Sequence, residues 1–152
     1  MKWIALLGLV LAGCGGSHAA SPAPRKHYPV FIRQPVVLPA PRLGLRNLPR
    51  FVSPTRLAIA TVGSSSCPSV PDELVVLTPH RIRIHLTVGS WENGRPVAHP
   101  PSGGVCTADY GTTQMVLAID PKLIDVHRPL TVRFFYNDSK KPLVRIAAPL
   151  SG

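Results

Sequence analysis

Strict alternation of apolar and polar side chains between His80 and Val88 constrains the fold of this chain more than any other feature. The even-numbered positions are apolar, namely Ile82, Ile84, Leu86 and Val88. The odd-numbered positions are polar, namely Arg81, Arg83, His85 and Thr87. Period two over eight residues is typical of a β-strand with one buried face and one face toward water. Residues 130–136 repeat the pattern, except that Phe135 falls on the otherwise polar side.

Short apolar runs between turn residues predict four further strands, at 57–62, 73–78, 114–119 and 143–148. Asn93-Gly94 predicts a tight turn, because both residue types tolerate a positive φ. Asp120-Pro121 predicts the cap of a single helical turn. No longer amphipathic helix is indicated. Together these signals predict an all-β fold, a small immunoglobulin-like two-sheet β-sandwich over residues 51–152.

The first residues have the pattern of a cleavable secretory signal. A positive start at Lys2 precedes an apolar run, residues 3–12, that is too short to cross a bilayer. Two small residues then lead into Cys14, and this arrangement resembles the lipobox of bacterial lipoproteins. The resemblance implies a signal peptide over 1–13, a diacylglyceryl group on the Cys14 sulfur, and a mature chain held on the extracytoplasmic face of the cell membrane. The alternative is an ordinary signal peptide that contains a cysteine.

If Cys14 carries lipid, Cys67 and Cys106 remain as an even pair in an oxidising compartment, which predicts a disulfide. Closing such a loop stabilises a small domain by about 4 kcal/mol on the loop-entropy estimate. A reactive or metal-binding thiol pair is the alternative, but the close CxxC spacing usual at such sites is absent.

Residues 14–50 differ in composition from the rest. They hold seven prolines and six basic residues with no acidic residue, which favours an extended tether. Two apolar runs, 28–32 and 36–38, are unusual for a solvated spacer, so docking on the domain as an edge segment is the alternative to a plain spacer. The basic charge would be drawn to anionic lipid headgroups or wall polymers.

Two polar clusters surround the paired cysteines, GSSSCP at 63–68 and CTADY at 106–110. A disulfide would bring Ser64, Ser65 and Ser66 near Asp109. A nucleophilic serine would need a positioned base and the second glycine of a G-x-S-x-G turn, and both are missing from the sequence around it. We therefore expect these serines and Asp109 to fix the two loops through backbone hydrogen bonds, with ligand contact as the second interpretation. Trp91, in a turn, is expected to bind a ligand or to fold back over the core.

A GSSSCP stretch followed by a CTAD stretch resembles small secreted and lipid-anchored β-domain proteins of high-GC Gram-positive bacteria. The similarity covers residues 57–136, with Val62 where an aromatic residue is more usual. The resemblance implies the fold and the cellular address only, and it carries no functional residue.

Histidine placement predicts neither a metal site nor a cofactor. His80 and His85 are five residues apart and would face opposite ways in a strand. Four arginines could share an outer sheet face and bind an anionic polymer, but we expect them to be ordinary solvated strand residues: Arg81, Arg83, Arg133 and Arg145. Nucleic acid is not expected, because no aromatic platform lies among them.

From the sequence we expect a non-catalytic binding module, anchored by lipid and exposed at the cell envelope. Its expected partner is an envelope protein or an anionic wall polymer. A small envelope hydrolase with an unidentified active site is the alternative, and it would require a carboxylate and a histidine within hydrogen-bond reach in a pocket. The oligomeric state is not indicated by the sequence.

Overall fold

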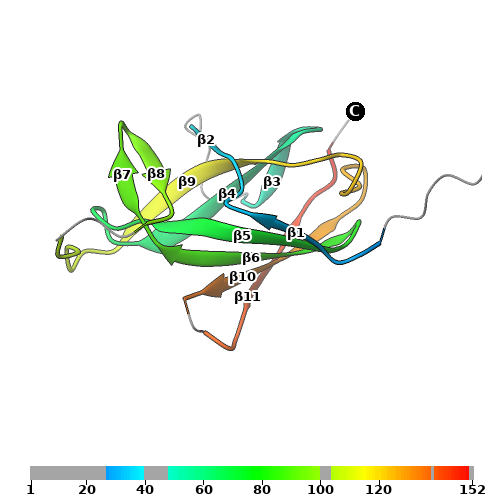
Figure 1. Cartoon of the computed structure of the whole chain (residues 1–152). Coiled ribbons are helices and arrows are strands. Elements are labelled where there is room, and N and C mark those ends of the chain that lie inside the picture. Colours follow the sequence, from blue (N-terminus) through cyan, green and yellow to red (C-terminus); the bar gives the residue numbers. More distant parts are fainter. Residues whose placement is uncertain (1–26, 40–47, 100–103, 138, 151–152) are drawn as a thin grey trace, which may run out of the picture.

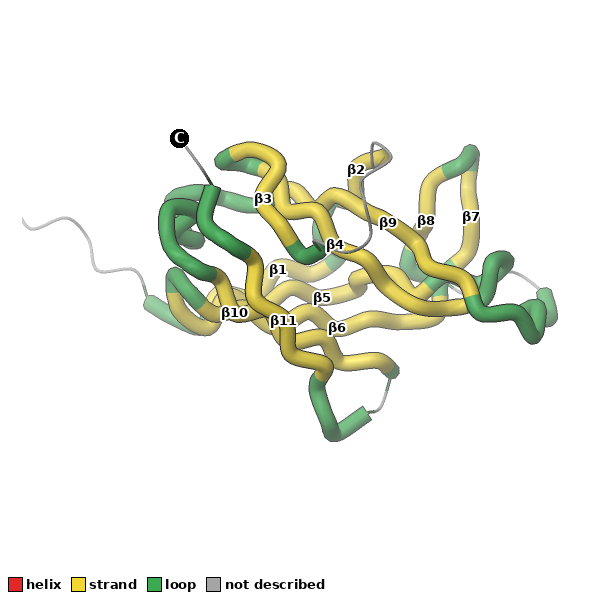
Figure 2. Tube along the Cα trace, turned by 180° about the vertical axis from the view of Figure 1, so that it is seen from behind, coloured by secondary structure: helices red, strands yellow, loops and turns green. Residues whose placement is uncertain are grey.

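A computed structural model describes residues 27–39, 48–99, 104–137 and 139–150. The expected signal peptide and Cys14 lie outside these residues. Two β-sheets stack face to face and a short hairpin projects at one end (Figure 1). Loops gather mainly at the two ends of the stack (Figure 2).

The first sheet has five strands in the order β1-β5-β6-β10-β11. Their bounds are β1 Val30–Arg33, β5 Ser69–Thr78, β6 Arg81–Val88, β10 Leu130–Tyr136 and β11 Leu143–Ala147. β6 and β10 run parallel, while the other neighbours in this sheet are antiparallel.

The second sheet has four strands in the order β2-β9-β4-β3, all antiparallel. Their bounds are β2 Val37–Pro39, β9 Gly111–Ala118, β4 Arg56–Gly63 and β3 Arg50–Ser53. A separate hairpin pairs β7, Ser90–Glu92, with β8, Arg95–Val97.

Alternating side chains from both sheets form one core. Leu57 and Ile59 of β4 and Leu117 of β9 belong to the same buried cluster as Ile84 of β6 and Val132 of β10, and all five are fully buried. Every second side chain of a strand points into the space between the sheets, so the alternation in the sequence matches the alternation of buried residues. The all-β two-sheet fold with one disulfide is confirmed.

All six strands expected from residue 57 onward are present, some with longer bounds. β5 begins four residues earlier than expected and contains Pro71 beside a shift in register between Pro71 and Glu73. A proline cannot donate to a ladder, and a bulge accommodates it.

The expected domain boundary at Phe51 differs from the structure. β1 pairs with β5 and β2 pairs with β9, so part of the expected tether completes the two sheets. Val30, Ile32 and Tyr28 pack against the core, and the Tyr28 hydroxyl donates to the Leu123 carbonyl at 2.9 Å. This segment forms strands despite its prolines, because its apolar side chains are buried on the side of each strand that faces the core.

Two details separate this arrangement from an immunoglobulin domain. The β6–β10 pair is parallel, whereas immunoglobulin sheets are antiparallel. Cys67 and Cys106 lie in loops outside the strands, whereas the immunoglobulin bridge joins two strands across the core.

Both short-range turn predictions are confirmed. Asn93 and Gly94 have φ values of 50° and 72°, as the β7–β8 turn requires. The Asp120 side chain accepts from the Lys122 N–H at 2.8 Å, and its carbonyl accepts from Leu123 and Ile124. Among the described residues there is no helix, and hence none long and apolar enough to cross a membrane.

We predict that a chain beginning at Phe51 loses cooperative unfolding, whereas a chain beginning at His27 keeps it. The shorter chain loses β1 and β2, whose core-facing side chains each contribute up to about 1.5–3 kcal/mol by burial. That loss is comparable with the whole stability of a small domain. Urea unfolding followed by circular dichroism measures it, and equal midpoints for the two chains would contradict the early boundary.

Candidate functional site at the disulfide end

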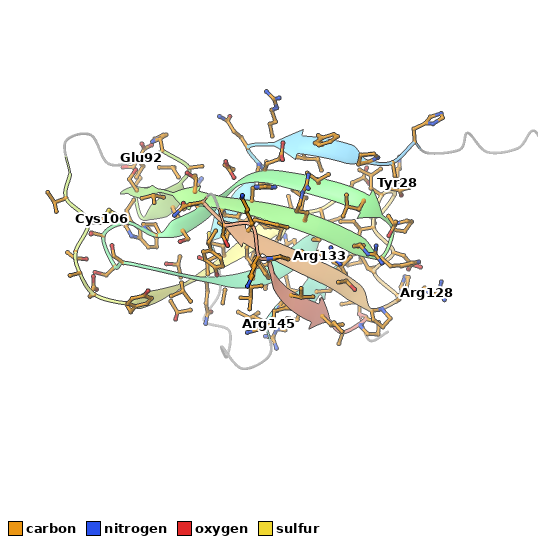
Figure 3. All side chains as sticks on the ribbon, turned by 90° about the horizontal axis from the view of Figure 1, so that it is seen from below. Tyr28, Glu92, Cys106, Arg128, Arg133 and Arg145 are labelled. Carbon is orange, nitrogen blue, oxygen red and sulfur yellow. A yellow bond between two sulfur atoms is a disulfide. The ribbon has the colours of Figure 1, made fainter. Side chains whose placement is uncertain are left out.

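A disulfide joins Cys67 and Cys106, whose Cα atoms are 5.4 Å apart, as the cysteine count predicts. Cys67 is buried in the loop between β4 and β5, whereas Cys106 is exposed in the segment before β9. We call residues 64–67, Trp91 and 104–110 the disulfide end. In Figure 3, Cys106 and Tyr28 lie at opposite ends of the sandwich.

Serine hydroxyls hold the first loop in shape. The Ser64 hydroxyl accepts from the Cys67 N–H at 2.9 Å and lies 3.3 Å from the Ser66 hydroxyl. The Ser66 hydroxyl accepts from the Thr107 N–H at 2.9 Å and lies 3.1 Å from the Thr107 hydroxyl. The two loops are therefore joined by hydrogen bonds as well as by the disulfide, as expected for structural serines.

Asp109 accepts hydrogen bonds from both loops. The Ser65 N–H donates to its carboxylate at 3.3 Å, and the Thr107 hydroxyl donates to the same oxygen. Hydrogen bonds from the side chains of Ser65 and then Thr107 lower the pKa of Asp109 to about 2. The carboxylate is therefore charged at neutral pH, and it links loops that are 42 to 44 residues apart in sequence.

Trp91 lies over the serine loop and not over the core. Its indole N–H donates to the Ser65 carbonyl at 2.8 Å, and 44% of the residue is exposed. The expectation that it folds back as a lid on the core is corrected, because Trp91 belongs to the projecting β7–β8 hairpin, where it pairs with Pro96.

Two glycines permit the close packing behind the disulfide end. A Cβ at Gly63 would lie 2.8 Å from the Ser69 nitrogen and 2.9 Å from the Cys67 oxygen. A Cβ at Gly89 would clash with the Val97 carbonyl oxygen and the Val70 side chain. The first residue of GSSSCP is therefore a glycine because the loop folds tightly against the end of β4.

Sequence reasoning missed three residues of this site. Tyr110 and Val105 are each 93% exposed, the highest exposures among the large apolar side chains of the described residues. Thr107 joins the network of Ser65, Ser66 and Asp109. Tyr110 directly precedes β9. Because it lies outside the strand, the alternation of apolar and polar residues does not predict whether its side chain is buried or exposed.

The hydroxyl–carboxylate cluster is unsuited to nucleophilic catalysis. A carboxylate with a pKa near 2 is a weak base at neutral pH, and no histidine of the described chain hydrogen-bonds to these serines. A carboxylate–histidine pair does exist at Glu92 and His99, 3.3 Å apart, with more than half of each side chain exposed. His99 lines a cavity of about 360 Å³, so the pair meets the requirement stated for the hydrolase alternative, although no hydroxyl or thiol side chain lines this cavity among the described residues.

The four predicted arginines do not share one face. Arg81, Arg83 and Arg133 lie on the outer face of the five-stranded sheet, because they alternate with the buried residues of β6 and β10. Arg145 is in register with the fully buried Val132 and lines a groove of about 830 Å³ between the edges of the two sheets. A shift of one residue along a strand places a side chain on the opposite face of the sheet, and Arg145 is one residue away from the outward-facing position 144.

Within the described residues, no three His, Cys, Asp or Glu side chains converge as a metal site would require. His85 instead stacks on Phe135, with ring centroids 5.2 Å apart. This contact also accounts for the phenylalanine on the polar side of β10.

Comparison of the chain with protein-family models, curated proteins and solved structures found no match.

We predict that the Asp109 carboxylate titrates near pH 2 in the folded chain, below its ordinary value of 3.8. Because the folded pKa is lowered, the stabilisation by its hydrogen bonds is present above about pH 4 and is lost as the pH falls through about 2. Carboxyl-carbon NMR measures the midpoint, and Ser65→Ala should raise it. Asp109→Asn should remove this acid dependence of stability, whereas Asp125→Asn should keep it. A midpoint near 3.8 would contradict the network.

Proposed function

We propose that this protein is a lipid-anchored, extracytoplasmic, non-catalytic binding module of the cell envelope, and that its disulfide end contacts an envelope protein. The proposal extends the resemblance of residues 1–14 to a lipoprotein signal. It also rests on the Cys67–Cys106 disulfide, which is typical of an oxidising compartment and leaves Cys14 as the third cysteine.

One observation carries the binding proposal: exposed apolar side chains stand on a rigid base. Tyr110 and Val105 are almost fully exposed, and Trp91 is partly exposed while its indole N–H is fixed to the serine loop. A large side chain that is already held in place, as Trp91 is, loses little conformational entropy on binding, and aromatic residues often dominate protein interfaces.

The position of this end suits a tethered protein. Tyr28 marks the end of the sandwich nearest the N-terminal segment, and Cys106 marks the opposite end (Figure 3). A chain anchored through Cys14 would present the disulfide end away from the point where the tether enters the domain. An anionic polymer is disfavoured as the ligand of this end, because Asp109 is exposed and negatively charged there.

The anchor is tested with Cys14→Ala in the full chain. We expect the wild-type protein to remain with membranes after a high-salt and carbonate wash, and the variant to be released or to keep residues 1–13. Cys106→Ala is the matched control, since it removes a different thiol and should leave the protein in the membrane fraction. Equal fractionation of wild type and Cys14→Ala would contradict lipid anchoring.

The binding end is tested by photo-crosslinking in living cells. A photoreactive phenylalanine analogue at Tyr110 should form one discrete crosslinked species, whereas the same analogue at Val36, which is 61% exposed elsewhere, should not. Tyr110→Ser should weaken recovery of that species about tenfold or more when the analogue stands at Val105. Crosslinking that is equal at positions 110 and 36, or absent at both, would contradict a binding role.

A further inference from the structure

The outer face of the five-stranded sheet carries more positive than negative charge, since Glu73 faces Arg33 but Arg81, Arg83 and Arg133 have no acidic residue opposite them. Arg83 of β6 lies directly opposite Arg133 of β10 in the parallel pair, and Arg81 lies opposite Thr131. Among the described residues, His99–Glu92 is the one ion pair within 4.0 Å, so no described arginine pairs with a described carboxylate. Like charges opposite one another destabilise a sheet, so this arrangement calls for an anionic partner.

Neither of the two central arginines, Arg83 and Arg133, hydrogen-bonds through its side chain to another described residue. The Nε atoms of Arg83 and Arg133 are buried and make no hydrogen bond, and neither side chain is bonded to a described residue. The Arg83 guanidinium lies 5.9 Å from the centre of the Phe135 ring. The stems of these arginines therefore lie along the sheet, and their charged ends are not neutralised by the protein.

Exposed apolar side chains flank the arginines on both edge strands. β1 contributes Phe31, which is 57% exposed, and β11 contributes Val144 and Ile146, which are 45% and 68% exposed. The register places these three side chains on the same face as Arg83 and Arg133. Arginines bordered by exposed aromatic and aliphatic side chains are typical of a surface that lies on anionic headgroups and inserts its apolar side chains among them.

Chain length places this face within reach of a membrane. Twelve residues lie between Cys14 and His27, so an anchor at Cys14 holds the start of the domain within about 45 Å of the bilayer. β1 is the first strand after that segment, and it is an edge strand of the arginine-bearing sheet. Arg33 on β1 adds a fourth positive charge to the face. Glu73 of β5 lies directly opposite Arg33 and next to His85 on this face, so the net positive charge belongs to Arg81, Arg83 and Arg133.

We infer that the outer face of the five-stranded sheet docks on the anionic headgroup surface of the membrane that anchors the chain. The inference rests on the proposed function in taking Cys14 as the anchor. Phosphate groups accept paired hydrogen bonds from arginines such as Arg83 and Arg133, and Phe31 and Ile146 enter the interface beside them. Docking through this face leaves the disulfide end free, because Cys67 and Cys106 lie in loops at the end of the sandwich.

The test uses the lipidated mature protein reconstituted in vesicles. Trp91→Phe removes the tryptophan that the mature chain retains, and Phe31→Trp places a reporter on the docking face. Quenching of the added emission by brominated lipid is compared in vesicles of phosphatidylglycerol with phosphatidylcholine and in phosphatidylcholine alone. We expect quenching in the anionic vesicles, and its loss at about 0.5 M NaCl, where charges act only within roughly 4 Å.

Matched variants assign the effect to the face. Arg83→Gln with Arg133→Gln should lower the ratio of docked to undocked protein about thirtyfold, because each arginine near an anionic surface contributes about fivefold. Arg56→Gln with Arg128→Gln removes the same charge from exposed positions elsewhere and should leave quenching unchanged. Circular dichroism checks that both double variants are folded.

Vesicle flotation separates this inference from the anchor. Protein that does not float with vesicles lacks the anchor, and the proposed function then fails. Protein that floats without quenching in anionic vesicles, or whose quenching survives the loss of both arginines, overturns the docking face alone. Binding of Cys14→Ala protein to soluble poly(glycerol phosphate) through Arg83 and Arg133, without quenching in vesicles, would also overturn it, because the arginines would then serve a wall polymer.

Discussion

The covalent bond between Cys67 and Cys106 is the constraint on which the disulfide end depends. The cysteines are 39 residues apart, and closing such a loop reduces the entropy of the unfolded chain by an amount equivalent to about 4 kcal/mol. The hydrogen bonds among Ser65, Ser66, Thr107 and Asp109 are exposed, and hydroxyls in water exchange partners with little net gain. The disulfide keeps the two loops close enough for these weak bonds to persist.

The core of the sandwich is separate from the two surfaces for which we propose functions. The space between the sheets is filled by the alternating apolar residues, so the core makes no use of the arginines or the serines. The outer face of the five-stranded sheet gathers Arg81, Arg83 and Arg133, and the loops at one end gather Trp91 and Tyr110. The outer sheet face and the disulfide end are different parts of the molecule. In our proposal an anchored chain can therefore dock on the membrane and bind a partner at the same time.

The sequence could predict the features that depend on local patterns. Period two placed the inner residues of β6 and β10, the Asn93-Gly94 pair placed a turn, and the cysteine count gave the disulfide. It marked the runs 28–32 and 36–38 of the proline-rich segment as too apolar for a spacer, but it could not predict that they form β1 and β2 or which strands they pair with, because the partners β5 and β9 are far away in sequence. Arg145 illustrates the same limit, since its face is set by the register of β11 on β10. The candidate site was predicted as a cluster of serines with Asp109, but the exposure of Tyr110 depends on how two distant loops meet.

A non-reducing peptide map of protein extracted from cell membranes tests the central claim most directly, because it reports all three cysteines in one measurement. The account predicts one disulfide-linked pair of peptides containing Cys67 and Cys106, and an N-terminal peptide that starts at Cys14 and carries the mass of a diacylglyceryl group. Free thiols at Cys67 and Cys106, on a chain that still begins at Met1, would contradict it.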